Sequence, residues 1–347
     1  AEVPDGAIRS PLVRLNYRIP DAPHVRVWLK LENLQPIASF KLRAATAAIA
    51  AARADPASCA LLAKHGVVTA SAGNMAQGVA YIAAQQTPPV PCTVFVPDHA
   101  PQMKLDAIRR MGGTVVPITF DEWWQIIITH KAPHEGLFVH PVCSPHVLAG
   151  NGSIGCEVWE DLPAVDAVIT PYGGGALSCG IANSLRELHR EDTAATVTAD
   201  EGKGQARAPV QIYACEVETA APLSAALAAG QPTVVEYTAS WVDGCGSKCV
   251  LESMWPLAQD LVAGSLVVTL DDAARAVKLL VERNKIIAEG AGGAAVAAAI
   301  KHARRLAAAC GKKGQEEGSA PVNVVAVISG GGIDNDVLIK CLKGPSF

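Results

Sequence analysis

Short apolar runs alternate with alanine-rich stretches of helical period along most of this chain. Residues 165–170 show no polar alternation, as expected of a strand that helices cover on both faces. The pattern predicts an α/β fold with mostly parallel sheets. Strands are predicted at residues 24–31, 67–70, 92–96, 114–118, 165–170, 211–216 and 322–328. Helices are predicted at residues 42–54, 75–84, 104–111, 150–158, 178–189, 271–285 and 289–300.

Two polar segments interrupt this alternation. Residues 191–208 are charged and rich in threonine and glycine, and residues 311–319 are polar. Residues 191–208 have no apolar period and are predicted to be a surface insertion that carries no chemistry, and residues 311–319 are predicted to be a loop.

Composition and charge narrow the class of protein. The chain has 347 residues, of which 50% are hydrophobic and 18% charged, so it can bury a large core in about two domains. Its net charge of -4 comes without a basic block, which argues against nucleic acid or a membrane surface as a partner. Charged residues or glycine break the apolar runs, so no membrane-spanning helix is expected.

Cysteine usage bears on the compartment. The ten cysteines are scattered singly, mostly in apolar segments, as expected of reduced and buried thiols. The first residues lack the basic and then apolar pattern of a secretory signal. These observations predict an intracellular, cytoplasmic protein.

The candidate chemistry begins at Lys41, where a polar loop containing Pro36 leads into an alanine-rich helix. Ser39 and Phe40 precede the lysine. A lysine at this place is either a solvated residue of the first helical turn or a Schiff-base lysine, whose amine must be partly desolvated. The second interpretation requires a phosphate-binding turn and a partner for a cofactor ring elsewhere in the chain.

A glycine-rich turn at residues 173–177 is the candidate phosphate site. It follows a buried strand and precedes a helix, so its backbone N–H groups and the helix dipole favour an anion. A plain tight turn is the alternative. The spacing G-x-G-x-x-S fits a dinucleotide fingerprint poorly, and the sequence lacks the G-K-[ST] of a nucleotide-binding P-loop there.

Two more predicted strands end in turns that contain serine. Ser71 to Asn74 follow residues 67–70 and offer hydroxyl and backbone donors at a helix N-terminus. Ser329 follows the last strand and precedes three glycines. By itself, Ser329 is as well explained as a helix cap.

The motifs SFK, SAGN, GGGAL and SGGG occur in this order, and together they resemble those of the fold type II pyridoxal-phosphate (PLP) enzymes. The most similar branch contains the serine/threonine dehydratases and serine racemase, and the resemblance covers nearly the whole chain. It implies a tryptophan synthase β-like fold of two α/β domains. Residues 1–44 and 149–347 would form the large, PLP-binding domain, and residues 45–148 the small domain.

The resemblance also implies roles for single residues. Lys41 would form the Schiff base with PLP and then remove the α-proton of the substrate. Asn74 would bind the phenolic oxygen of the ring, and Ser329 would face the pyridine nitrogen. The implied cofactor-binding residues are Phe40, Lys41, Asn74, Gly173, Gly174, Gly175, Ala176, Leu177 and Ser329. The implied substrate-binding residues are Ser71, Ala72, Gly73, Asn74 and Met75.

The implied reaction eliminates the β-hydroxyl of a 3-hydroxy amino acid of the L-threonine or L-serine type, giving a 2-oxo acid and ammonia. A neutral hydroxyl at Ser329 weakens the ring as an electron sink, which favours elimination over transamination. Family racemases carry a serine where this chain has Ala72, which cannot accept a proton, so a dehydratase is favoured over a racemase. Family dehydratases usually have histidine at the position of Met75. The methionine either packs in the core or lines the pocket and favours a bulkier β-substituent.

Several matches are less specific. Glu216 matches a metal-ligand glutamate, but the second ligand falls near Pro222, which has no side-chain oxygen, so the presence of a divalent or monovalent cation stays open. Asp243, Gly244 and Glu289 match positions near the active-site wall. Homologous folds imply a homodimer that acts on a small amino acid. The printed sequence ends soon after SGGG, so no isoleucine-responsive regulatory domain is expected.

Three alternatives to the dehydratase remain. A serine racemase or a β-replacement synthase would have the same fold and the same lysine. A non-catalytic amino-acid-binding relative would have the fold without the chemistry, and the intact Lys41, Asn74, glycine turn and Ser329 argue against it.

Overall fold

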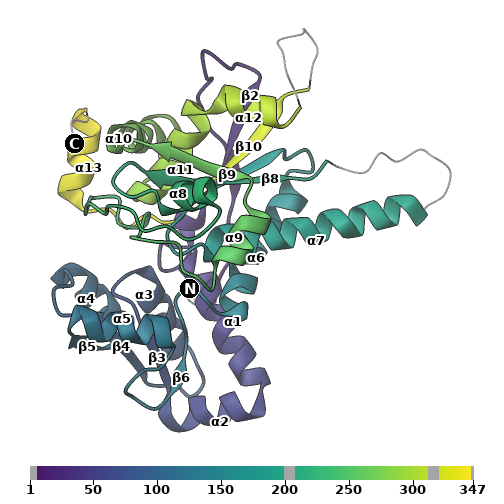
Figure 1. The fold of residues 1–347 in the computed structure, drawn as a ribbon. Helices are drawn as coiled ribbons and strands as arrows, with labels where there is room; N and C mark the ends of the chain where they lie inside the picture. The colour runs from purple at the N-terminus through teal and green to yellow at the C-terminus, as the bar shows by residue number, and fades with distance from the viewer. Residues whose placement is uncertain (1–5, 199–207, 312–319, 345–347) are drawn as a thin grey trace. The chain divides into compact units, whose positions relative to one another are not determined.

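The computed structural model describes residues 6–198, 208–311 and 320–344. Contacts divide the chain into two compact units, drawn in Figure 1. Unit 1 comprises Ala1–Ile8 and Gln35–Asn151, and unit 2 comprises Arg9–Leu34 and Gly152–Phe347.

The smaller unit begins earlier than the predicted position 45. Helix α1 (Lys41–Ala54) packs on α3 (Asn74–Ala84), so the helix start that carries Lys41 belongs by contacts to unit 1. Gly78 makes this packing close, because a Cβ on it would lie 3.2 Å from the Lys41 carbonyl oxygen. The predicted segment 1–44 is therefore split between the two units.

Unit 1 contains a four-stranded parallel sheet in the order β5-β4-β3-β6. Apolar side chains of β3 and β4 pack against Ile126 and Ile127 of α5, which buries one face of the sheet. The strands are β3 (Val67–Ala70), β4 (Cys92–Pro97), β5 (Thr114–Ile118) and β6 (Leu137–Phe138). The other helices are α2 (Pro56–His65), α4 (Gln102–Arg110), α5 (Phe120–Thr129) and the first turns of α6 (Pro145–Asp161).

Unit 2 contains a six-stranded sheet in the order β1-β2-β10-β7-β8-β9. Strand β1 is antiparallel to β2, and the other neighbours are parallel. The strands are β1 (Leu12–Arg14), β2 (Val25–Lys30), β7 (Ala167–Pro171), β8 (Gln211–Val217), β9 (Gly264–Val268) and β10 (Val322–Val327). The helices are α7 (Ala176–Thr198), α8 (Pro222–Ala229), α9 (Trp255–Leu261), α10 (Leu270–Leu279), α11 (Gly290–Lys301), α12 (Ala303–Ala309) and α13 (Asn335–Lys343).

Helix α11 is the central helix of unit 2. It contacts the five parallel strands of the sheet and is buried along nearly its whole length, while α10 packs on α11 and also contacts α13 (Figure 1). Its small residues allow this burial: a Cβ on Gly292 would lie 3.4 Å from the Ser329 backbone nitrogen. The glycine-rich start of α11 therefore brings the helix close to the end of β10.

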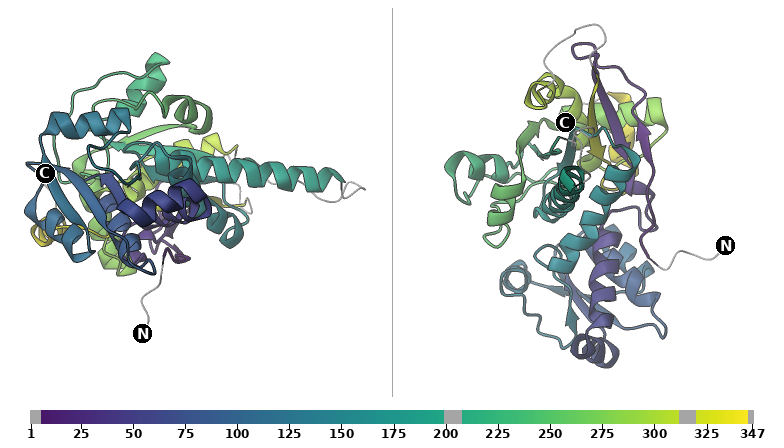
Figure 2. Two further views of the ribbon diagram at one scale, coloured as in Figure 1. Left: turned by 90° about the horizontal axis from the view of Figure 1, so that it is seen from below. Right: turned by 90° about the vertical axis from the view of Figure 1, so that its right-hand side faces the viewer.

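Some elements differ from the sequence prediction. Helix α7 continues to Thr198, past the predicted end at 189, and Figure 2 shows its long extension. Residues 191–198 of the predicted surface insertion are therefore helical. Residues 199–207 of that insertion, and residues 312–319 of the predicted loop, lie outside the described residues. The predicted helix 271–285 is divided into α10 and a π-helical turn, Leu280–Asn284.

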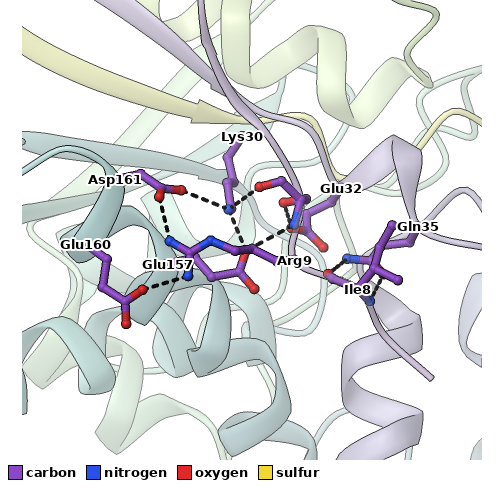
Figure 3. Close-up of polar contacts among 9 residues, drawn as sticks. Ile8, Arg9, Lys30, Glu32, Gln35, Glu157, Glu160 and Asp161 are labelled. Atoms are coloured by element: carbon purple, nitrogen blue, oxygen red, sulfur yellow. Dashed lines mark hydrogen bonds and ion pairs between the residues drawn. The ribbon is translucent and has the colours of Figure 1, made fainter. Parts of the chain in front are cut away.

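A buried ion-pair cluster ties β2 to α6 within unit 2 (Figure 3). The fully buried Lys30 ends β2, and its Nζ donates to Glu157 Oε2 at 2.5 Å and to the Ser10 carbonyl oxygen at 2.7 Å. Arg9 continues the cluster at the surface by pairing with two further carboxylates of α6. A buried lysine needs such partners, because desolvating an unpaired charge costs several kcal/mol, roughly.

Candidate active site

Lys41 is the first residue of α1, and a tight turn shapes the loop before it. Ala38 N–H donates to the Gln35 carbonyl oxygen at 2.6 Å, and Ala38 has a φ of 55°. A left-handed backbone at a non-glycine residue costs roughly 1–2 kcal/mol, so the surrounding contacts must hold the turn. The buried Ser39 accepts the N–H of Lys41 on its Oγ at 3.4 Å and the N–H of Leu42 on its carbonyl oxygen at 3.2 Å. These contacts start the helix at Lys41.

The Lys41 amine is half-buried and lies against the segment that follows β6. Its Nζ donates to the Pro141 carbonyl oxygen at 3.0 Å and lies 5.2 Å from the centroid of the Phe40 ring. Partial desolvation is what a Schiff-base lysine requires. This environment fits that role better than the role of a freely solvated lysine.

The predicted substrate loop lies in the same unit, between β3 and α3. Ser71 Oγ accepts Gly73 N–H at 3.2 Å, and α3 begins at Asn74 without a side-chain cap. Residues 71–74 are half-exposed, so a carboxylate can approach the N-terminus of α3. Met75 differs from them, because its side chain is 2% exposed, which favours core packing.

In unit 2, the glycine turn joins the buried strand β7 to α7. Gly175 has a φ of 90°, and a Cβ on it would lie 2.9 Å from the Tyr172 hydroxyl oxygen, so a side chain there would be strained. A Cβ on Gly173 would lie 3.2 Å from the Gly244 carbonyl oxygen. The turn therefore presents backbone at the N-terminus of a long helix, which fits the phosphate of PLP.

Backbone hydrogen bonds hold this turn in place. Tyr172 N–H donates to β8 at 2.9 Å, and Gly246 N–H donates to the Tyr172 carbonyl oxygen at 2.9 Å. Gly174 is half-buried, whereas Ala176 and Leu177 open α7 with buried side chains. The residues predicted to bind the phosphate thus form one continuous, anchored strand-to-helix connection.

Ser329 lies just after β10 and is 1% exposed. Its Oγ donates to Glu289 Oε1 at 2.9 Å, and Glu289 N–H donates to the Gly330 carbonyl oxygen at 2.9 Å. The sequence placed Glu289 near the active-site wall without a role, and the structure makes it the partner of Ser329. Its position directly before the glycine cluster of α11 was the available signal.

Glu216 is fully buried at the end of β8, where it caps α8. Its Oε1 accepts the N–H of Leu223 at 2.8 Å, and its Oε2 accepts the N–H of Ser224 at 2.8 Å and the Oγ–H of Ser265 at 2.6 Å. Burial raises the pKa of this carboxyl group, while the three hydrogen bonds lower it. Both oxygens are occupied by protein donors, which disfavours the predicted role as a metal ligand.

Among the described residues, one group of three side chains has the chemistry of metal ligands. The possible ligand atoms of His130, His140 and Cys143 lie within 4.8 Å of one another. However, His140 Nδ1 accepts the N–H of Val142 at 3.0 Å and of Cys143 at 2.7 Å, and His140 Nε2 lies 3.0 Å from the Ile127 carbonyl oxygen. Both ring nitrogens are bonded to backbone, so the group is a hydrogen-bonded turn and not an open metal site.

Each unit carries a separate part of the predicted site. Unit 1 holds Lys41 and residues 71–75, which lie on α1 and at the start of α3, two helices that pack on each other. Unit 2 holds residues 173–177 and Ser329. The contact between Lys41 and Pro141 was missed by sequence reasoning, because no pattern marks a carbonyl oxygen as a partner.

These features together define the class of protein. A partly buried lysine begins one helix, a glycine turn begins another, and a buried serine follows a central strand, as in the fold type II PLP-dependent enzymes. The chain belongs to the pyridoxal-phosphate dependent enzyme family, whose model matches residues 3–330. The predicted family, fold class and cofactor are confirmed.

Individual relatives extend this result. Over 319 residues the chain is 33% identical to the L-threonine ammonia-lyase of Thermotoga maritima, an alignment that covers 91% of this chain and 70% of that protein. The processed form of threonine deaminase isoform 2 from Solanum lycopersicum superposes with a TM-score of 0.79 at 28% identity, covering 98% of this chain and 84% of that one. Serine racemase from Dictyostelium discoideum superposes with a TM-score of 0.74 at 28% identity, covering 94% of each chain.

In the described part of the chain, no helix is both long enough and apolar enough to cross a bilayer.

Proposed function

We propose that this protein is a PLP-dependent ammonia-lyase that eliminates the β-hydroxyl of a small 3-hydroxy amino acid of the L-threonine or L-serine type. The products are a 2-oxo acid and ammonia. The observation that carries the proposal is the half-buried Lys41 amine at the start of α1, in a chain 33% identical to an L-threonine ammonia-lyase. When bound, PLP supplies an electron-accepting ring that makes the α-hydrogen of the substrate acidic.

In this proposal, Lys41 holds PLP and then acts as the base. Its Nζ donates to the Pro141 carbonyl oxygen, which helps to hold the nitrogen in the place from which it would take the α-proton. Once protonated, the same nitrogen still has an acceptor in that carbonyl group, which stabilises the ammonium form. Pro141 thereby supports both protonation states of the base.

The other residues bind and orient. Residues 173–177 would hold the phosphate through backbone N–H groups, and Ser329 would meet the ring nitrogen. Asn74 would bind the phenolic oxygen, and Phe40 would pack beside the ring. Residues 71–75 would take the substrate carboxylate at the N-terminus of α3, chiefly through residues 71–74, since Met75 is buried.

A serine racemase of the same fold is the second candidate, and one structural neighbour carries that title. A racemase needs a second proton donor and acceptor on the opposite face of the substrate. Ala72 has no group that can exchange a proton, so elimination is favoured. No described residue of the candidate site favours a β-replacement synthase over these two.

The assembly and the compartment belong to the same proposal. A homodimer follows from the resemblance to homologous folds. An intracellular, reducing compartment is supported by the cysteines: all ten lie in the described part of the chain, and each has a free thiol there.

The test is a panel of 3-hydroxy amino acids incubated with the PLP-loaded protein and assayed for 2-oxo acid and ammonia. We expect both products in equal amounts from L-threonine or L-serine. Formation of D-serine without pyruvate would favour the racemase. A purified protein that stays colourless with PLP would favour the non-catalytic relative.

A further inference from the structure

We propose that His140 is a positioning residue for the Lys41 amine and that it acts through the carbonyl oxygen of Pro141. The inference rests on the proposed function of Lys41 and deepens it. All groups involved lie in unit 1.

The hydrogen bonds of His140 define its tautomer. Its Nδ1 accepts two backbone N–H groups, from Val142 and from Cys143, so this nitrogen carries no hydrogen. Its Nε2 therefore carries the hydrogen and donates to the Ile127 carbonyl oxygen at the end of α5. The ring is therefore neutral, and both of its nitrogens are hydrogen-bonded to backbone groups.

These bonds fix the turn that contains Pro141. The turn is residues 140–143, which follow β6 and fold back on the His140 ring. Val139 N–H donates to Val68 of β3 at 2.8 Å and so anchors the start of the turn on the sheet. Pro141 is buried within the turn, and its carbonyl oxygen points at Lys41 Nζ at 3.0 Å.

The surroundings keep the imidazole neutral. Burial is the main cause that lowers the pKa of His140 to about 4; the nearby His130 and Lys41 act in the same direction, and the Ile127 hydrogen bond acts against them. The titratable groups that face the ring are His130 at the end of α5, Lys41 at the start of α1 and Cys143 in the turn. A doubly protonated ring would lose the acceptor that holds the turn.

Two polar substitutions distinguish the hydrogen bonds made by Nδ1 from the hydrogen bond made by Nε2. The Oδ1 of His140→Asn lies near the position of Nδ1 and can still accept the N–H groups of the turn. In His140→Gln the longer side chain places its amide near the position of Nε2. It can therefore keep the hydrogen bond to the Ile127 carbonyl oxygen, but it no longer accepts the N–H groups of the turn. Both variants bury an amide, so a loss of stability alone would affect them similarly.

The first measurement uses the full chain stripped of PLP, labelled competitively with acetic anhydride. The ratio of label on Lys41 to label on Lys64 of α2 is read by mass spectrometry of the digest. We expect Lys41 to react about tenfold faster in His140→Gln, because its ammonium form loses a hydrogen-bond acceptor. In His140→Asn the ratio should stay within about twofold of wild type, because the turn keeps its acceptor.

The second measurement uses the PLP-loaded enzyme. Misplacing the base by about 1 Å costs on the order of 100-fold, so kcat of His140→Gln should fall by about that factor while KM changes less than about twofold. His140→Asn should retain most of kcat. Equal Lys41 labelling in the two variants would overturn the inference. If wild type proves to have no lyase activity, the proposed function fails, and the labelling experiment still decides the role of His140.

Discussion

Ser329 Oγ donates a hydrogen bond to Glu289 Oε1 at 2.9 Å, with both side chains buried in unit 2. The carboxylate also fills the space beside Gly330, where a Cβ would lie 2.6 Å from Glu289 Oε2. The orientation of the serine proposed to meet the PLP ring is therefore set by an acidic residue of the same unit.

The first prediction is that Glu289→Ala weakens PLP binding by about tenfold, because the buried Ser329 hydroxyl would lose the acceptor that orients it, a bond worth about 0.5–1.5 kcal/mol. Glu289→Gln is the matched control, since its amide oxygen can still accept the bond. The measurement is a PLP titration of the stripped protein followed by absorbance. Equal affinity in wild type and Glu289→Ala would show that Ser329 does not need this partner.

The second prediction concerns Ala72. Elimination should outpace racemisation, because Ala72 offers no proton-exchanging group. L-serine is incubated with the enzyme, and D-serine is followed by chiral chromatography alongside pyruvate. Ala72→Ser should raise the ratio of D-serine to pyruvate, and Ala72→Gly serves as a control for size. Wild-type enzyme that forms D-serine faster than pyruvate would contradict the argument.

The third prediction concerns Met75, whose side chain is 2% exposed. Met75→His should lower the free energy of unfolding by about 1–3 kcal/mol, because it buries a polar ring in an apolar site. The ratio of kcat/KM for threonine to that for serine should stay the same, and Met75→Leu should cost less than about 1.5 kcal/mol. A changed ratio in folded, yellow Met75→His protein would mean that this side chain does line the substrate pocket.

The fourth prediction compares two cations of the cluster in Figure 3. Lys30→Ala should cost about 3–5 kcal/mol of unfolding free energy, because it removes the buried cation that pairs with the largely buried Glu157. Arg9→Ala should change stability little, because the Arg9 side chain is 52% exposed and its ion pairs are solvated. Urea unfolding of both variants measures the difference. Equal losses would mean that burial does not set the value of these pairs.

Sequence patterning predicted strands that are short apolar runs bounded by turns. The strands at 67–70 and 114–118 match β3 and β5, because each is a short apolar run between turns. Helix α7 is longer than predicted. Beyond Leu185 its described side chains are no longer buried, so this part of the helix has no apolar face and the sequence shows no apolar period there. Helix α5 was missed although its capping box, Thr119 with Glu122, is visible in the sequence.

For the candidate site, too, the sequence predicted some features and missed others. Motif order alone marked Lys41, the glycine turn and Ser329, because these residue types are required by the chemistry of the resembled family. The contacts that orient them, Pro141 to Lys41 and Glu289 to Ser329, join residues far apart in the chain. Long-range contacts of this kind depend on how the helices and strands pack, and no local pattern encodes them.

The fifth prediction tests the central claim, that Lys41 carries PLP and acts as the base. The PLP-loaded protein is reduced with borohydride and digested, and the modified peptide is located by mass spectrometry. We expect the PLP adduct on Lys41, and we expect Lys41→Ala to lose both its visible colour and its turnover, whereas Lys64→Ala keeps both. An adduct on another lysine, or a Lys41→Ala protein that stays yellow and active, would contradict the account.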